Sequence, residues 1–208
     1  MLKRVLLTAG LLTVAGTSAQ AQITVAPPGA GRVQMQVQNP ASPKKPTIYG
    51  GSIIWRTETR NDGTALVGDM TFAPGGLKAQ VTLSHNTDAT MPAQFLAQIK
   101  FDIPPNFPEG NIFAVQGVTT SQKPEQAGQP LDGALMKVTQ NVYLMGMIDP
   151  VDEKGREAKL LKASPFFHIN LFFENHHRAI VTFEKGTAGE PLFKATMAQW
   201  AQQEKAKK

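Results

Sequence analysis

Histidine is the side chain in this sequence best suited to metal binding or to acid–base catalysis near neutral pH, and the chain has four. Two of them, His176 and His177, are adjacent at the tip of an expected hairpin. Consecutive strand residues point to opposite sides, so such a pair seldom chelates a metal ion alone. The chain has no His-Glu-x-x-His motif, no His-x-His motif and no cysteine. We therefore expect no metal site, and we exclude disulfides, zinc–thiolate sites, iron–sulfur clusters and thiol catalysis.

His168 and Asn170 lie in an apolar segment, residues 166–173, whose sequence alternates as in a strand. Both fall on one face of this segment together with Phe166 and Phe172, and that face is too apolar for open solvent. We expect a cover over it and a hydrogen-bonded histidine beneath, and we also take His168 and Asn170 as candidate ligand-binding residues. A general base needs a nucleophile and an orienting acid within reach. The sequence indicates neither, so we expect no catalytic residue.

Motifs of common hydrolases and nucleotide-binding proteins are missing from the chain. It contains neither a Gly-x-Ser-x-Gly elbow nor a Gly-x-Gly-x-x-Gly or P-loop pattern. Asp149 and Asp152 flank Pro150 and could hold calcium, but their spacing matches no known loop, and capping a following helix is the simpler role. The sequence indicates no cofactor. Whether the protein is an enzyme stays open, and a non-enzyme is expected.

Two aromatic residues, Trp55 and Phe107, are further candidates for ligand binding. Trp55 alternates with Ile53 and Thr57, which is typical of core burial, and stacking on a ligand is the alternative. Phe107 stands in a loop, residues 103–110, that three prolines stiffen. Rigid loops lower the entropic cost of binding. A structural strap that packs Phe107 inward is the other interpretation.

The elements that position these residues are mostly strands, because the dominant hydrophobic period is two. Residues 77–84 alternate apolar and polar side chains, and residues 95–103 do the same. Such segments form half-buried strands of an antiparallel sheet, with one face in the core and the other in water. Further strands are expected at residues 52–60, 66–72, 111–118, 134–140, 142–148, 166–174 and 179–184. Glycine-containing turns at residues 61–63 and 74–76 join the first three strands into a meander.

Two helices are expected in the second half of the chain. Residues 152–163 form a short one. Pro191 suits the first turn of an amphipathic C-terminal helix, where its missing N–H costs nothing. An apolar stripe at helical spacing follows, formed by Phe193, Met197 and Trp200. We expect this helix to pack on the sheet and to cover the face that carries His168 and Phe172.

The first 21 residues are typical of a secretory leader. Lys3 and Arg4 form its basic start, residues 5–15 its apolar stretch, and Ala19-Gln20-Ala21 a small-x-small cleavage site. The apolar stretch is about half the roughly 20 residues of a spanning helix, and no later run comes closer. We therefore expect no membrane span after leader cleavage and a periplasmic or secreted bacterial protein. A leader that is not cleaved and stays as an N-terminal anchor is the alternative.

The rest of the chain divides into a linker, one domain and a tail. Residues 22–47 contain five prolines and are expected to be a Pro/Gln-rich linker. Within it, Val33, Met35 and Val37 alternate with glutamines, which indicates either an edge strand or a segment that pairs with a partner. Residues 48–203 are expected to form a single mainly-β domain, and residues 204–208 a basic tail.

The positive charge of the chain comes from its two ends. The net charge is +5, but residues 46–204 carry 13 basic and 16 acidic residues, a net charge of −3. A nucleic-acid-binding protein should concentrate lysine and arginine on its folded domain. We therefore expect no nucleic-acid partner.

Four segments stand out by their order and spacing. They are Ile54-Trp-Arg-Thr-Glu58, Asn86-Thr-Asp88 followed by Pro92-Ala93, Ile103-Pro-Pro-Asn-Phe-Pro108, and Glu184-Lys-Gly-Thr-Ala-Gly-Glu190. Together they resemble an uncharacterised family of bacterial exported or membrane-attached envelope proteins. That family has no assigned activity, so the resemblance implies a shared module and transfers no catalytic residue. The hairpin tip departs from the family, because His176-His177 stands where asparagine, glycine and arginine are expected.

These observations predict a mainly-β fold with an antiparallel, sandwich-like core, a short helix near residues 152–163 and a C-terminal helix on the sheet. A lone sheet with one covered face is the alternative. The predicted function is a non-enzymatic binding or assembly module of the bacterial cell envelope, whose partner is another envelope protein or polymer. The alternative is an enzyme acting on envelope polymer or lipid, which requires His168, Asp102 or Asp149 to converge with other polar groups in a concave pocket.

Overall fold

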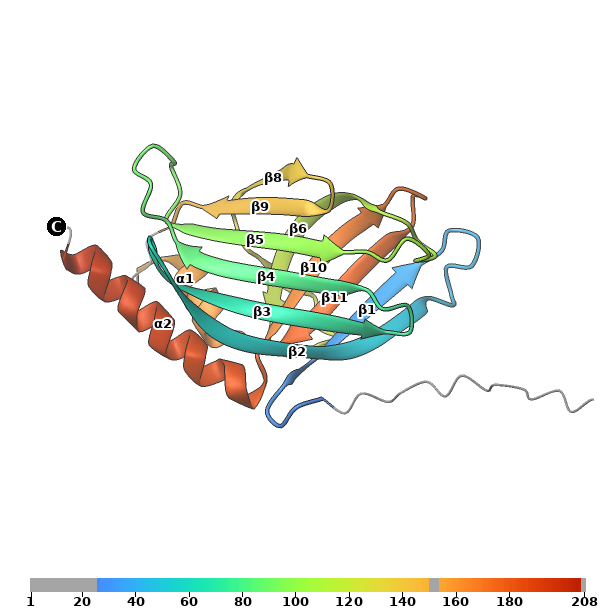
Figure 1. The fold of residues 1–208 in the computed structure, drawn as a ribbon, viewed down its shortest axis with the longest axis horizontal. Coiled ribbons are helices and arrows are strands. Elements are labelled where there is room, and N and C mark those ends of the chain that lie inside the picture. The colour runs from blue at the N-terminus through green and yellow to red at the C-terminus, as the bar shows by residue number, and fades with distance from the viewer. Residues whose placement is uncertain (1–25, 150–153, 207–208) are drawn as a thin grey trace, which may run out of the picture.

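The period-two alternation forms one antiparallel sheet of 11 strands in the computed structural model, which describes residues 26–149 and 154–206 (Figure 1). The strands are β1 (Gly31–Gln38), β2 (Thr47–Arg60), β3 (Gly63–Ala73), β4 (Lys78–His85), β5 (Phe95–Asp102), β6 (Ile112–Ser121), β7 (Gln129–Pro130), β8 (Ala134–Thr139), β9 (Val142–Met147), β10 (Phe166–Phe173) and β11 (Arg178–Glu184). The described helices are α1 (Arg156–Ala163) and α2 (Gly186–Ala206). The strand order is β7-β6-β10-β11-β1-β2-β3-β4-β5-β9-β8. The expected mainly-β antiparallel core with a C-terminal helix packed on it is confirmed.

The sheet curls until its two ends face each other. Lys137 of β8 donates from Nζ to the carbonyl oxygens of Ile112 and Phe113 in β6, at 3.3 Å each. Tyr143 of β9 donates from its hydroxyl to the same Ile112 oxygen at 2.9 Å. The two facing layers of the core are therefore parts of one continuous sheet.

The core fills the inside of this curl, and its two openings are covered differently. Alternate residues of most strands point inward, as in β1, which buries every second side chain and exposes the rest. Helices α1 and α2 lie across one opening (Figure 1). At the other, the loop between β5 and β6 places Phe107 against Tyr49 and Phe173, with ring centroids 5.2 and 6.0 Å apart.

Helix α2 packs against the inner face of the sheet, and the expectation that it covers His168 and Phe172 was wrong. Phe193 of α2 stacks on Phe167 of β10 at 5.7 Å and meets Trp55 edge-on at 4.7 Å. Phe167 and His168 are neighbours in one strand, so they point to opposite faces. The helix takes the inner face because that face offers the larger apolar surface to bury.

The expected linker is corrected over residues 31–38, and the domain begins before residue 48. These residues form β1, which lies between β11 and β2 in the middle of the sheet and is not an edge strand. Val33, Met35 and Val37 are each at most 3% exposed. Burial of these three side chains stabilises the segment as a strand of the sheet, although the surrounding prolines favour an unpaired linker.

Several predicted boundaries also move or lie outside the described residues. The predicted leader, residues 1–21, lies outside them, and so does Asp152. Helix α2 begins at Gly186, five residues before Pro191, and in its first turn the Ala188 N–H donates to the Gly29 carbonyl oxygen at 3.1 Å. It continues to Ala206 through the start of the expected tail. None of the helices in the described ranges is long and apolar enough to cross a membrane.

Candidate functional site

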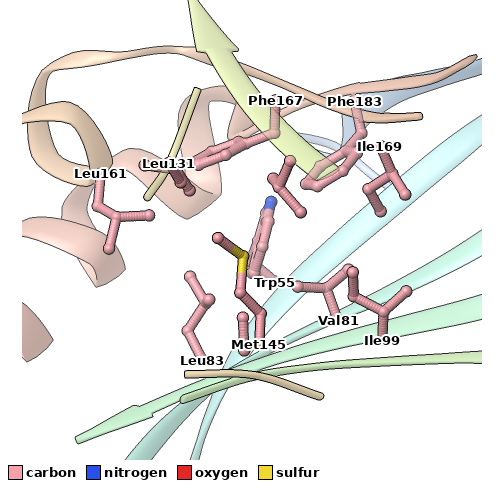
Figure 2. A pocket seen from close by; sticks show the side chains of 12 residues that line it. Trp55, Val81, Leu83, Ile99, Leu131, Met145, Leu161, Phe167, Ile169 and Phe183 are labelled. Carbon is pink, nitrogen blue, oxygen red and sulfur yellow. The ribbon is translucent and has the colours of Figure 1, made fainter. Parts of the chain in front are cut away.

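A small cavity remains inside the curled sheet around Trp55 (Figure 2). The indole stands between Phe167 and Phe183 on one side and Leu83 and Met145 on the other. The volume of this cavity is about 20 Å³, and its lining is apolar. That is space for about one water molecule, which needs polar partners that this wall lacks, and it is far below the roughly 300–1,000 Å³ of ligand sites. The cavity is a packing gap of the core.

Trp55 joins α2 to the sheet and is 6% exposed. Its Nε1 donates to the carbonyl oxygen of Glu184 at 3.2 Å. A Cβ on Gly189 of α2 would lie 2.6 Å from the indole, and one on Gly68 of β3 would lie 2.9 Å from it. Both neighbours must therefore be glycine for the helix and the strand to come this close. The geometry fits the core interpretation of Trp55 and leaves no ring face open for stacking on a ligand.

Phe107 is likewise buried, at 4% exposure, and lies in the loop that covers the second opening. The loop is closed by hydrogen bonds from Phe107 N–H to Pro104 and from Gly110 N–H to Phe107, at 3.0 and 3.1 Å. This arrangement is the structural strap, with the ring packed inward.

The hairpin-tip histidines contact that same loop. Nδ1 of His177 lies 2.6 Å from Oε2 of Glu109, and the Asn175 side chain donates to the same oxygen at 2.8 Å. His176 adopts a φ of 67°, as the tight turn requires. Within the described ranges, no three His, Cys, Asp or Glu side chains form a group that could hold a metal ion. The Glu109 cluster joins residues 66 and 68 positions apart, and no local sequence pattern indicates it.

His168 lies on the outer face of β10, where it is 6% exposed and fully hydrogen-bonded. Ser121 donates its hydroxyl proton to the Lys123 carbonyl at 2.6 Å, so it accepts from His168 Nε2–H at 2.7 Å. The Thr182 hydroxyl then donates to Nδ1 at 2.9 Å. Burial lowers the pKa of His168 and favours this neutral form. The Ser121 proton faces a carbonyl and no acid orients the ring, so the pair lacks the geometry of a nucleophile and its base.

The three residues on which the enzyme hypothesis depends do not converge. Asp102 is exposed at the end of β5. Asp149 accepts the Arg156 N–H at 2.8 Å, which supports its predicted role at the start of α1. Hydrogen bonds from the Glu157 carboxyl and from that N–H lower the pKa of Asp149, while burial and the Asp149 contact raise the pKa of Glu157. His168 and the two aspartates line neither the inner cavity nor the two surface hollows.

The larger surface hollow lies on the outer face of the sheet, over β1, β11, β10 and β6, and has a volume of about 420 Å³. We call it the amide groove, because most of its polar side chains are amides. Its polar lining residues are Gln36, Gln38, Gln116, Asn170 and Arg178, and Pro43 and Pro46 form one wall. Asn170 is the only predicted ligand-binding residue that lines it; Trp55 and Phe107 point into the core. A smaller hollow of about 250 Å³ lies between β6 and α1.

A β-bulge shapes the floor of the amide groove. In the β6–β10 ladder, Gly117 pairs with Asn170 and Val115 with Leu171, so Gln116 is an extra residue. A bulge of this kind turns outward a side chain that would point into the core if the strand continued its regular alternation. Val115 is buried and Gln116 exposed, which puts Gln116 on the face of Asn170. Gly117 has no atom within 4 Å of the position a Cβ would take, so the space over Asn170 stays open.

The groove contains one cation and no lining carboxylate. The Arg178 guanidinium lies 5.2 Å from the centroid of the Phe172 ring, and no carboxylate in the described part of the chain pairs with it. The side-chain amides of Gln36, Gln116 and Asn170 make no hydrogen bond to another described residue. Their donors and acceptors are thus free for a ligand. The alternating glutamines of β1 were the signal for this site, but sequence alone does not show which strands lie beside them.

The four segments that carry the family resemblance lie where loops are closed or where elements pack against one another. Trp55 packs against the segment from Glu184 to Glu190, and Asn86 closes its loop by donating to the carbonyl oxygens of Asp88, Met91 and Ala93 at 2.7–3.1 Å. Comparisons of the chain with protein-family models, curated proteins and solved structures found no match. The resemblance to an envelope-protein family stays a prediction.

Proposed function

We propose that this protein is a non-enzymatic binding module of the bacterial cell envelope that holds an envelope protein or polymer in the amide groove. The observation that carries the proposal is the groove itself, about 420 Å³ in volume, in which the amides of Gln36, Gln116 and Asn170 make no hydrogen bond to another described residue. Its volume is within the range of about 300–1,000 Å³ typical of binding sites. The scattered positions of His168, Asp102 and Asp149 favour binding over catalysis. The leader-like N-terminus supports export to the periplasm or beyond.

A variant that fills the groove tests this function. Gly117→Phe places a ring over Asn170, and the open space at the Gly117 Cβ position lets the fold accept it. Gly50→Phe is the matched control, because Gly50 also has open space but pairs with Gln34, which does not line the groove. The full chain is immobilised and exposed to envelope extract. Wild type and Gly50→Phe should retain the same component, and Gly117→Phe should lose it.

Two results would overturn the proposal. One is retention of the component by Gly117→Phe at the wild-type level, because binding would then occur elsewhere. The other is recovery of no component by wild type, with consumption of an envelope polymer or lipid in the same extract, which would indicate an enzyme. Fractionation of bacteria that express the full chain tests the location. Protein confined to the cytoplasm would contradict export.

A further inference from the structure

We propose that the amide groove binds a saccharide chain that carries an anionic group, with Arg178 at the anion and the amides at the sugar hydroxyl and amide groups. This inference rests on the proposed function and names the chemical class of its ligand.

The position of the groove disfavours an extended peptide. The groove lies on the face of β1, β11 and β10, and each of these strands has a hydrogen-bonded neighbour on both sides. Their backbone N–H and C=O groups are therefore occupied within the sheet, and a peptide cannot add to them as a further strand. Recognition must come from side chains. This favours a ligand with many polar groups of its own along the chain.

The amide side chains suit such a ligand in chemistry and spacing. Gln36 pairs with Ile180, and Ile180 pairs with Asn170, so the two amides are two strand spacings apart, about 10 Å. Each amide offers two donors and one acceptor, which matches hydroxyl groups that both donate and accept. Ile180 is 44% exposed between them and offers an apolar surface to the C–H face of a sugar ring.

Arg178 provides a charged contact at the edge of this arrangement. It pairs with Gln38 across the β1–β11 ladder and with Phe172 across the β10–β11 ladder. The ring of Phe172 holds the guanidinium, so less conformational entropy is lost when an anion binds. The Gln38 amide lies 3.5 Å from the Pro43 carbonyl oxygen and ties the proline wall to β1. A carboxylate on the sugar can bind the guanidinium through two parallel hydrogen bonds.

Two oligosaccharides that differ in charge test the inference by NMR titration of the full chain. The acidic probe is a hyaluronan hexasaccharide, which alternates glucuronate with N-acetylglucosamine, and the neutral probe is hexa-N-acetylchitohexaose, in which every sugar is N-acetylglucosamine. Both should shift the side-chain amide signals of Gln36, Gln116 and Asn170, and the acidic probe should bind at least tenfold more tightly. Arg178→Gln should abolish that difference, and Asn170→Leu should weaken both probes at least tenfold.

The matched controls lie on the outer face of β5, outside the groove. Gln98→Leu removes an exposed amide and Lys100→Gln an exposed cation, and both should bind the probes like wild type. If Arg178→Gln and wild type bind the acidic probe equally well, Arg178 does not bind an anionic group of the ligand, and that part of the inference is overturned. Failure of both probes, while Gly117→Phe still loses an envelope component that wild type retains, would overturn the saccharide assignment and leave the proposed function intact. Identification of that component as a protein would likewise overturn the saccharide assignment and leave the proposed function intact.

Discussion

At the scale of single residues, His168 shows how a histidine on the outer face of a sheet becomes a buried, neutral group. Its two ring nitrogens are taken up by Ser121 and Thr182, at 2.7 and 2.9 Å. Because burial lowers its pKa, the folded state resists a proton that the unfolded chain accepts at a pKa of about 6.5. The unfolded state then binds more protons between the lowered pKa and this ordinary value, so stability falls as the pH falls through that window.

Substitution of His168 should therefore flatten the pH dependence of stability. His168→Gln keeps a donor and an acceptor for Ser121 and Thr182 but does not titrate. Between about pH 7.5 and pH 5, the free energy of unfolding should fall more steeply for wild type than for His168→Gln. Chemical denaturation at a series of pH values measures both slopes. Parallel slopes for wild type and His168→Gln would contradict the prediction.

At the scale of elements, the joint between β11 and α2 determines how the helix sits on the sheet. Lys185 is 1% exposed in its side chain and donates from Nζ to the Lys162 carbonyl at the end of α1, at 2.8 Å. The same nitrogen lies 3.4 Å from Oε2 of Glu190 and 4.7 Å from the centroid of the Phe193 ring. Burial lowers the pKa of Lys185. One side chain thus connects α1, β11 and α2.

The close approach of α2 to Trp55 predicts an unusual response to a helix-favouring substitution. Glycine to alanine inside a helix normally stabilises it by about 1 kcal/mol. Gly189→Ala should instead destabilise the protein by about 1–3 kcal/mol, because the new Cβ would lie 2.6 Å from the indole. Thermal denaturation measures the change. Gly50→Ala, which meets no atom within 4 Å, should leave the melting temperature nearly unchanged, and an equal response of the two variants would exclude the steric explanation.

The far end of α2 depends on Trp200, which is 1% exposed and donates from Nε1 to the Thr64 carbonyl at 2.9 Å. Its ring meets Phe95 at 5.8 Å. Trp200→Ala should cost about 3–5 kcal/mol, as expected for deletion of a large buried aromatic side chain. Denaturant unfolding of the purified monomer measures this cost. An unchanged stability, together with loss of a partner from envelope extract, would show that the helix serves binding and not folding.

At the scale of the whole molecule, side chains connect the two ends of the curled sheet where backbone pairing stops. Tyr143 and Lys137 both donate to the Ile112 carbonyl oxygen, and the Ile112 N–H donates to the Asn141 side chain at 3.0 Å. Burial raises the pKa of Tyr143 to about 12, so its hydroxyl keeps its proton at physiological pH. These contacts hold the curl together without a continuous ladder.

Removal of the Tyr143 hydroxyl should loosen this connection. Tyr143→Phe should cost about 1–2 kcal/mol, because a buried hydrogen bond is lost while Lys137 still satisfies part of the carbonyl. Amide hydrogen exchange at Ile112 should become faster, which distinguishes a local opening from global destabilisation. Tyr49→Phe is the control, because the Tyr49 hydroxyl makes no hydrogen bond within the described residues. Equal effects of the two variants would show that the connection at Ile112 contributes little.

The sequence by itself determined the type of most elements, because strand alternation and turn residues are local properties. The alternation at residues 77–84 and 95–103 corresponds to β4 and β5, and the glycine turns join β2, β3 and β4 in a meander. The apolar stripe of Phe193, Met197 and Trp200 is buried in α2 as predicted. Even β1 was visible as an alternating segment, although the prolines around it favoured a linker.

Only the tertiary structure decided which strands became neighbours and which face was covered. β1 pairs with β11, and the paired residues are 140 to 150 positions apart in the chain, because that contact buries the inner faces of both strands. Alternation shows that a strand has an inner face but not which partner completes it. The amide groove depends on that choice, since Gln36, Gln116 and Asn170 come from three strands distant in sequence. Gln116 also needs the bulge, an irregularity that appears only when β6 is aligned with β10 and the extra residue must turn outward.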